Sequence, residues 1–76
     1  MNLWIITQDR QHLLSVNHIW LGTEQEGQMS IVSVDSGGYD ITLGTYSVTR
    51  ASFVLNTIFE EMALPTTRHT FKMPSR

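Results

Sequence analysis

The feature that most constrains this chain is one helical pattern in its second half, which ends at Pro65. Five apolar residues recur there at intervals of three and four, the spacing that places side chains on one stripe of an α-helix: Ala51, Val54, Leu55, Ile58 and Met62. Ser47 stands at the expected N-cap, where its hydroxyl can accept from the backbone N–H of Thr49 or Arg50. Because proline lacks an N–H and disfavours helical geometry in the preceding residue, we predict a helix over residues 48–64.

Phe53 does not belong to the core face of this predicted helix. At about 100° per residue it points nearly opposite to the apolar stripe, beside Asn56 and Glu60. One copy of the chain offers no cover for it, so we expect Phe53 to contact another molecule.

The residues before the helix alternate as β-strands do. We expect strands over residues 3–6, 12–21, 29–35 and 39–46, an acidic hairpin loop over 22–27 and a glycine-rich turn over 35–38. In the second strand, alternation puts one set of side chains on a common face: Leu14, Val16, His18 and Trp20. Residues 70–73 are interpreted either as a short fifth strand or as a frayed terminus.

These patterns predict one α+β domain over residues 1–76, a four-stranded antiparallel meander followed by one helix packed on one face. A chain of 76 residues buries only about 60% of its unfolded surface, so its core is small. It has no cysteine, which excludes disulfides and thiolate metal sites. Self-association is the remaining way to reinforce so small a core, and we expect a homo-oligomer, most simply a dimer.

The first strand needs cover on both faces. Leu3 and Ile5 point to one side while Trp4 and Ile6 point to the other, and the helix can cover only one of them. This apolar run is too short to span a membrane and lacks the pattern of a secretion signal, so no membrane partner is expected.

Charge is distributed unevenly along the chain. Residues 1–65 contain all seven acidic residues and two of the five basic ones, a net charge of −5, whereas residues 66–76 contain three basic residues and no acid, a net charge of +3. The basic tail is interpreted either as a site for an anionic partner or as a segment lying against its own domain. Arg50 in the first helical turn is read either as part of an anion site or as the partner of an acid such as Asp40.

No set of residues carries recognisable catalytic, metal-binding or cofactor-binding chemistry. His12 and His18 would lie about 20 Å apart on one strand, too far to share a metal ion. Glu60 and Glu61 diverge by about 100° on the helix and so do not form an acid and base pair. We therefore expect no cofactor, no metal and no enzymatic activity.

The spare apolar and basic side chains instead predict a binding surface. Its candidate residues are Trp4, Ile6, Trp20, Tyr46, Arg50 and Phe53. In the alternative interpretation the protein binds single-stranded nucleic acid, with Trp4, Trp20 or Tyr46 stacking on bases while Arg10, Arg50 and the tail meet phosphates.

Several short motifs in the chain are similar to those of a known group of proteins. They are Trp4-Ile5-Ile6-Thr7-Gln8-Asp9, Leu43-Gly44-Thr45-Tyr46-Ser47, and Arg50-Ala51 leading into Val54-Leu55 and Ile58-Phe59. The chain resembles small uncharacterised proteins of phages, prophages and other mobile elements of Gram-positive bacteria. Those proteins often open with Trp-Ile and a Gln-Asp or Gln-Asn pair and carry Leu-Gly-x-Tyr before a helix with Arg-Ala near its start. It departs from them at Val48-Thr49, where acidic residues are usual.

This resemblance implies a cytoplasmic, non-enzymatic protein of phage type. Proteins of this kind and size often act on host macromolecules. We therefore expect it to bind and inhibit a host protein, an immunity nuclease being one candidate, in the manner of an anti-CRISPR protein.

Overall fold

The helix forms where the apolar spacing predicts it, as α1 (Val48–Met62). The Ser47 hydroxyl accepts from the backbone N–H of Arg50 at 3.3 Å, which confirms the predicted N-cap. Three residues of the apolar stripe are buried: Ala51, Val54 and Ile58. The expected stop at Pro65 lies outside the described residues.

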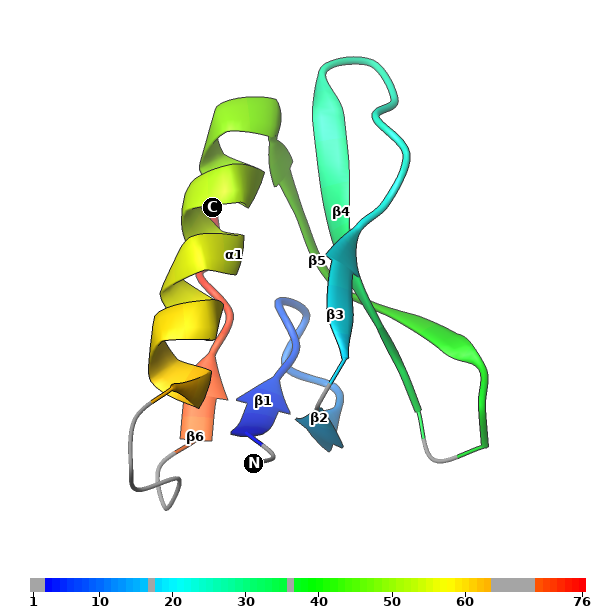
Figure 1. Ribbon diagram of the computed structural model, residues 1–76. Coiled ribbons are helices and arrows are strands. Elements are labelled where there is room, and N and C mark those ends of the chain that lie inside the picture. Colours follow the sequence, from blue (N-terminus) through cyan, green and yellow to red (C-terminus); the bar gives the residue numbers. More distant parts are fainter. Residues whose placement is uncertain (1–2, 17, 36, 64–69) are drawn as a thin grey trace.

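The computed structural model describes residues 3–16, 18–35, 37–63 and 70–76 and confirms an α+β fold (Figure 1). Besides α1, the described residues form six strands: β1 (Leu3–Ile6), β2 (Leu13–Val16), β3 (Ile19–Leu21), β4 (Gln28–Val34), β5 (Asp40–Ser47) and β6 (Thr70–Lys72). The short C-terminal strand is therefore present.

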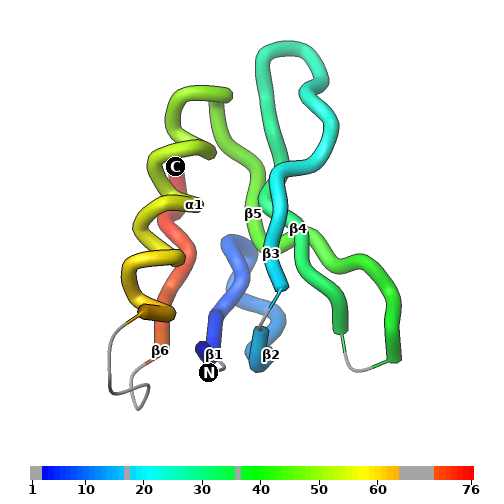
Figure 2. Tube along the Cα trace, viewed as in Figure 1, coloured from blue at the N-terminus to red at the C-terminus, as the bar shows by residue number. Residues whose placement is uncertain are grey.

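The strands divide between two sheets of three strands each. In the first sheet β1 is central, antiparallel to β2 and parallel to β6. In the second sheet β4 is central and antiparallel to both β3 and β5. Figure 2 shows β6 beside β1, so the last strand of the chain lies next to the first.

The predicted second strand over residues 12–21 is two strands, and each belongs to a different sheet. Val16 is buried in β2, but in β3 it is Ile19 that is buried, so the inward side changes from even to odd positions. The single face expected for Leu14, Val16, His18 and Trp20 was therefore wrong. An uninterrupted alternation cannot account for a strand that leaves one sheet and enters another.

Both expected turns connect strands of the second sheet. Glu26 and Gly27 have φ of 54° and 77°, and Gln25 and Gln28 exchange two backbone hydrogen bonds around them, the arrangement of a tight hairpin turn. In the other turn, the Asp35 carboxylate accepts from the backbone N–H groups of Gly37 and Tyr39, both at 2.9 Å. Ser36 of that turn lies outside the described residues.

The two sheets meet at an irregularity in β5. Ile31 is opposite Gly44 and Val32 is opposite Thr42, so Leu43 is the extra residue of a β-bulge. The Leu43 carbonyl accepts from the backbone N–H of Gln8 at 2.8 Å, which ties the segment after β1 to the edge of β5. The bulge thus lies where the segment after β1 reaches β5.

The core lies between α1 and the inward faces of both sheets (Figure 1). Its fully or almost fully buried members come from every layer: Leu3, Ile5, Val16, Ile19, Ile31, Leu43, Tyr46, Ala51, Val54, Ile58 and Met73. Among the described elements, α1 lies on the inward side of the sheets and none lies over the outward face of the first sheet.

Candidate functional site

The outward face of the first sheet carries large apolar side chains. In β1, Leu3 and Ile5 are 0% exposed, whereas Trp4 is 47% exposed and Ile6 is half-buried. Leu13 of β2 stands opposite Ile6 in the antiparallel register and is 58% exposed. We call Trp4, Ile6 and Leu13 the outer apolar face. It confirms that β1 presents apolar residues on both sides.

Polar side chains border the outer apolar face. Ser15 of β2 and Thr70 of β6 stand on either side of Trp4, and Lys72 of β6 stands beside Ile6. An apolar centre with a polar border is the composition typical of a protein–protein contact.

Trp20 does not join this face. It lies in β3 of the second sheet, opposite Val32, and its side chain is half-buried. Its ring meets that of His18 edge to face, with the centroids 5.1 Å apart.

Tyr46 is a core residue, which corrects its assignment to the binding surface. It is 2% exposed, and its hydroxyl donates to the carbonyl oxygen of Pro74 at 2.6 Å. Burial raises the pKa of the Tyr46 hydroxyl to about 12, although Arg50 and Arg10 act in the opposite direction. Tyr46 therefore cannot stack on a base or meet a partner.

Arg50 and Phe53 lie together on the outward side of α1. Phe53 is 60% exposed, as the helical periodicity predicts, and the Arg50 guanidinium carbon is 5.2 Å from the centre of its ring. Arg50 donates from Nε to the carbonyl oxygen of Arg76 at 3.0 Å. The expected pair with Asp40 does not form, because the length of β5, roughly 23 Å at 3.3 Å per residue, separates Asp40 from the helix.

Residues 73–76 are held by side chains that lie far from them in the sequence. Their four carbonyl oxygens each accept one hydrogen bond: Met73 from Arg10 Nη1 at 2.9 Å, Pro74 from Tyr46 Oη at 2.6 Å, Ser75 from Gln8 Nε2 at 3.0 Å and Arg76 from Arg50 Nε at 3.0 Å. We call these four donors the tail clasp. The described part of the basic tail, residues 70–76, therefore lies against its own domain. Arg68, another basic residue of the tail, lies outside the described residues.

Gln8 is the residue of the tail clasp that links most elements. Its side-chain oxygen accepts from the backbone N–H of Thr45 in β5 at 2.8 Å while its Nε2 donates to Ser75. Nothing in the periodicity of the chain indicates this role. In the sequence, Gln8 stood out only as part of the short motif Trp4-Ile5-Ile6-Thr7-Gln8-Asp9.

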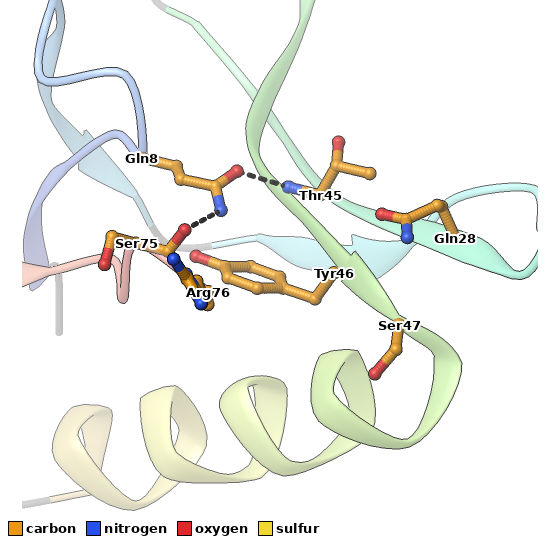
Figure 3. Close-up of a pocket in the computed structure, with 7 residues that line it drawn as sticks. All are labelled: Gln8, Gln28, Thr45, Tyr46, Ser47, Ser75 and Arg76. Atoms are coloured by element: carbon orange, nitrogen blue, oxygen red, sulfur yellow. Dashed lines mark hydrogen bonds between the residues drawn. The ribbon is translucent and has the colours of Figure 1, made fainter.

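A pocket of about 340 Å³ lies between the tail clasp and the start of α1. It is lined by Gln8, Gln28, Thr45, Tyr46, Ser47, Ser75 and Arg76, and Figure 3 shows the Gln8 side chain reaching both Thr45 and Ser75 across it. These lining residues supply hydroxyls, amides and a guanidinium, and none of them is a carboxylate, histidine or cysteine. The pocket can form hydrogen bonds with a bound group.

The turn after β1 contains a strongly hydrogen-bonded carboxylate. Asp9 Oδ1 accepts from the Thr7 hydroxyl at 2.5 Å and from the Gln11 backbone N–H at 3.0 Å. The hydrogen bond from Thr7 lowers the pKa of Asp9 most, followed by that from Gln11. Asp9 thus fixes the shape of the turn that carries Gln8 and Arg10.

The described residues form neither a metal site nor a membrane-spanning helix. In residues 3–16, 18–35, 37–63 and 70–76, no three His, Cys, Asp or Glu side chains lie close enough together to hold a metal ion. His69 lies outside the described residues. The described helix is neither long nor apolar enough to cross a membrane.

The six residues predicted for one surface lie in separate places. Trp4 and Ile6 form part of the outer apolar face, Arg50 and Phe53 lie on α1, and Trp20 lies on the second sheet, while Tyr46 is buried. No protein-family model, curated protein or solved structure matches this chain.

Proposed function

We propose that this protein is a non-catalytic, self-associating interaction protein of phage or mobile-element type that binds a host macromolecule through the outer apolar face. The observation that carries this proposal is the exposure of Trp4 and Leu13 beside Ile6 on the uncovered side of a sheet. Large apolar side chains that lie exposed beside one another mark contact sites, because their burial against a partner is favourable.

The partner that we propose is a protein of the host cytoplasm, and an immunity nuclease is one candidate. The sequence resemblance supplies this setting, and the uncharged, aromatic character of the outer apolar face fits a protein partner. Tryptophan at the centre of such a face is the residue type that most often dominates the energy of binding.

Self-association is tested first, by the molecular mass in solution over a range of concentrations. Wild-type protein is expected to increase in mass with concentration. The variant Trp4→Ser tests the outer apolar face: burying the exposed half of an indole against a partner is worth about 2 kcal/mol, so the dissociation constant for a host partner should rise roughly 30-fold. Phe53→Ser is the matched control, since it removes an exposed aromatic ring from α1.

Host partners are tested by capture from host lysate with wild-type protein and the same two variants. A specific partner should be retained by wild type and Phe53→Ser and lost with Trp4→Ser. Recovery of the protein alone, or equal capture by all three, would count against the proposal.

Single-stranded nucleic acid is the second candidate, and one observation favours it. The four described cations, Arg10, Arg50, Lys72 and Arg76, all lie within residues 70–76 or donate to them, and Lys72 stands beside the outer apolar face. Burial of Tyr46 leaves Trp4, on the face that Lys72 borders, and Phe53, beside Arg50, as aromatic residues available for stacking near these cations.

A fluorescence titration separates the two candidates. In a Trp20→Phe background the emission reports Trp4, and oligonucleotides should quench it less at higher salt if phosphates are bound. Absence of quenching at low salt would remove nucleic acid from consideration.

A further inference from the structure

The edge of β2 offers unpaired backbone groups. Among the described strands β2 pairs with β1 alone. Thr7 and His12 continue the register of this ladder, and the Thr7 N–H donates to the His12 carbonyl at 3.0 Å, so these two residues form a hydrogen-bonded pair. In an antiparallel ladder, hydrogen-bonded pairs alternate with pairs that are not hydrogen-bonded to each other. Leu14 and Val16 therefore bond to β1, whereas Leu13 and Ser15 direct their N–H and C=O groups away from it. These outward groups meet no hydrogen-bond partner in the described part of the chain.

The other edges near the first sheet are protected. Gln8 covers β5, because its backbone N–H donates to Leu43 and its side chain accepts from Thr45. The edge strand β6 carries Lys72 and is followed by Pro74, and charges and prolines are the features that keep sheet edges from pairing. β2 has the sequence Leu-Leu-Ser-Val and contains neither feature. β3 is shorter, and its Ile19 is buried.

We propose that β2 pairs antiparallel with β2 of a second copy, so that two three-stranded sheets become one sheet of six strands. This inference rests on the self-association proposed above and names the strand that performs it.

The pairing is self-complementary. About a two-fold axis at Leu14, Leu13 of one copy stands opposite Ser15 of the other, and each of these two pairs exchanges two N–H to carbonyl hydrogen bonds. Because β2 is uncharged, two copies approach without like-charge repulsion. The outward groups of Leu13 and Ser15 are all satisfied in this arrangement.

The outer apolar face of one copy is smaller than a stable interface. This favours a second copy as the occupant of the β2 edge, because pairing enlarges the face. Three strands about 4.8 Å apart and about four residues long present roughly 200 Å², whereas a stable interface needs about 800 Å² on each partner. Joining two sheets edge to edge brings the outer apolar faces of both copies onto one surface. The joined surface is about twice as large for a further partner.

Amide hydrogen exchange of the wild-type protein tests the strand directly. At a concentration where about nine-tenths of the protein is dimeric, exchange of the Leu13 and Ser15 amides should slow roughly tenfold relative to dilute protein, because only the monomer exposes them. The Leu14 and Val16 amides serve as the internal control, since their bonds to β1 exist at both concentrations.

Ser15→Pro tests the same bonds by substitution. The Ser15 N–H points away from β1, so proline removes an outward donor and leaves the β1–β2 ladder intact. Ser15→Pro should be monomeric at concentrations where Ser15→Ala is dimeric, and Ser15→Lys, which keeps the backbone donor but adds an edge charge, should also be monomeric.

The outcomes distinguish the two proposals. Concentration-dependent protection of Leu13 and Ser15 supports edge pairing. A dimer in which both amides exchange freely overturns edge pairing and leaves self-association through another surface. A protein that is monomeric at every concentration overturns both.

Discussion

The Tyr46 ring occupies the space that a side chain at Gly44 would need. A Cβ atom at Gly44 would lie 2.7 Å from the Tyr46 hydroxyl oxygen and 2.8 Å from its Cε2, closer than such atoms approach in proteins. Gly44 is therefore required by close packing, and this packing directs the Tyr46 hydroxyl to Pro74. The Leu-Gly-x-Tyr motif is explained by the way it anchors the end of the chain.

Gly44→Ala should lower the free energy of unfolding by about 1–3 kcal/mol, the usual cost of forcing an extra methyl group into a packed site. Urea denaturation measures this change. In a Tyr46→Ala background the ring is absent, so the same substitution should cost much less. Equal costs in both backgrounds would show that the Tyr46 ring is not the obstacle.

Tyr46→Phe should lower the free energy of unfolding by about 1–2 kcal/mol, because the Pro74 carbonyl loses its hydroxyl donor while the ring still fills its site. Thermal and urea denaturation check this value. Tyr39→Phe is the control, since Tyr39 is 74% exposed and its loss should leave stability almost unchanged. Equal effects of the two substitutions would contradict a stabilising role for the Tyr46 hydroxyl.

Alkaline pH should destabilise the protein through Tyr46. The pKa of this hydroxyl is about 12 in the folded state and 10.0 for an ordinary tyrosine, so the unfolded state loses its proton first. The contribution of Tyr46 is complete below pH 10 and is lost as the pH rises through 12. Denaturation between pH 9 and 12 should show a smaller loss in Tyr46→Phe than in wild type.

Acidic pH should destabilise the turn after β1 through Asp9. The pKa of Asp9 is lowered in the folded state, so its contribution is present above the ordinary value of 3.8 and is lost as the pH falls through the lower folded value. Asp9→Asn should therefore lose less stability than wild type when the pH is reduced below 4. If both proteins respond alike to acid, other carboxylates dominate the acid response.

Local patterns predicted the elements of this fold better than their pairing. The spacing of Ala51, Val54 and Ile58 identified the inward side of α1, and alternation identified the outward position of Trp4. These predictions succeeded because the periodicity of a helix or strand is a property of consecutive residues. Alternation failed between Val16 and Ile19, where the chain passes from one sheet to the other.

The candidate surface was predicted in part. Trp4 and Ile6 were identified because a strand that is apolar on both sides exceeds the cover one helix provides. Leu13 was missed, since its place beside Ile6 depends on the register of two strands. Tyr46 was misplaced because its acceptor, Pro74, lies 28 positions away in the sequence.

By itself, the sequence determined the helix with its Ser47 cap, the turns with their glycine and Asp35 signals, and the two-sided character of β1, because each depends on neighbouring residues. Only the tertiary structure decided that the strands divide into two sheets and that β2, among the described strands, pairs with β1 alone. It also decided that Gln8, Arg10, Tyr46 and Arg50 converge on residues 73–76. These contacts join positions up to 67 apart, as between Gln8 and Ser75, and no local pattern records which distant groups will meet.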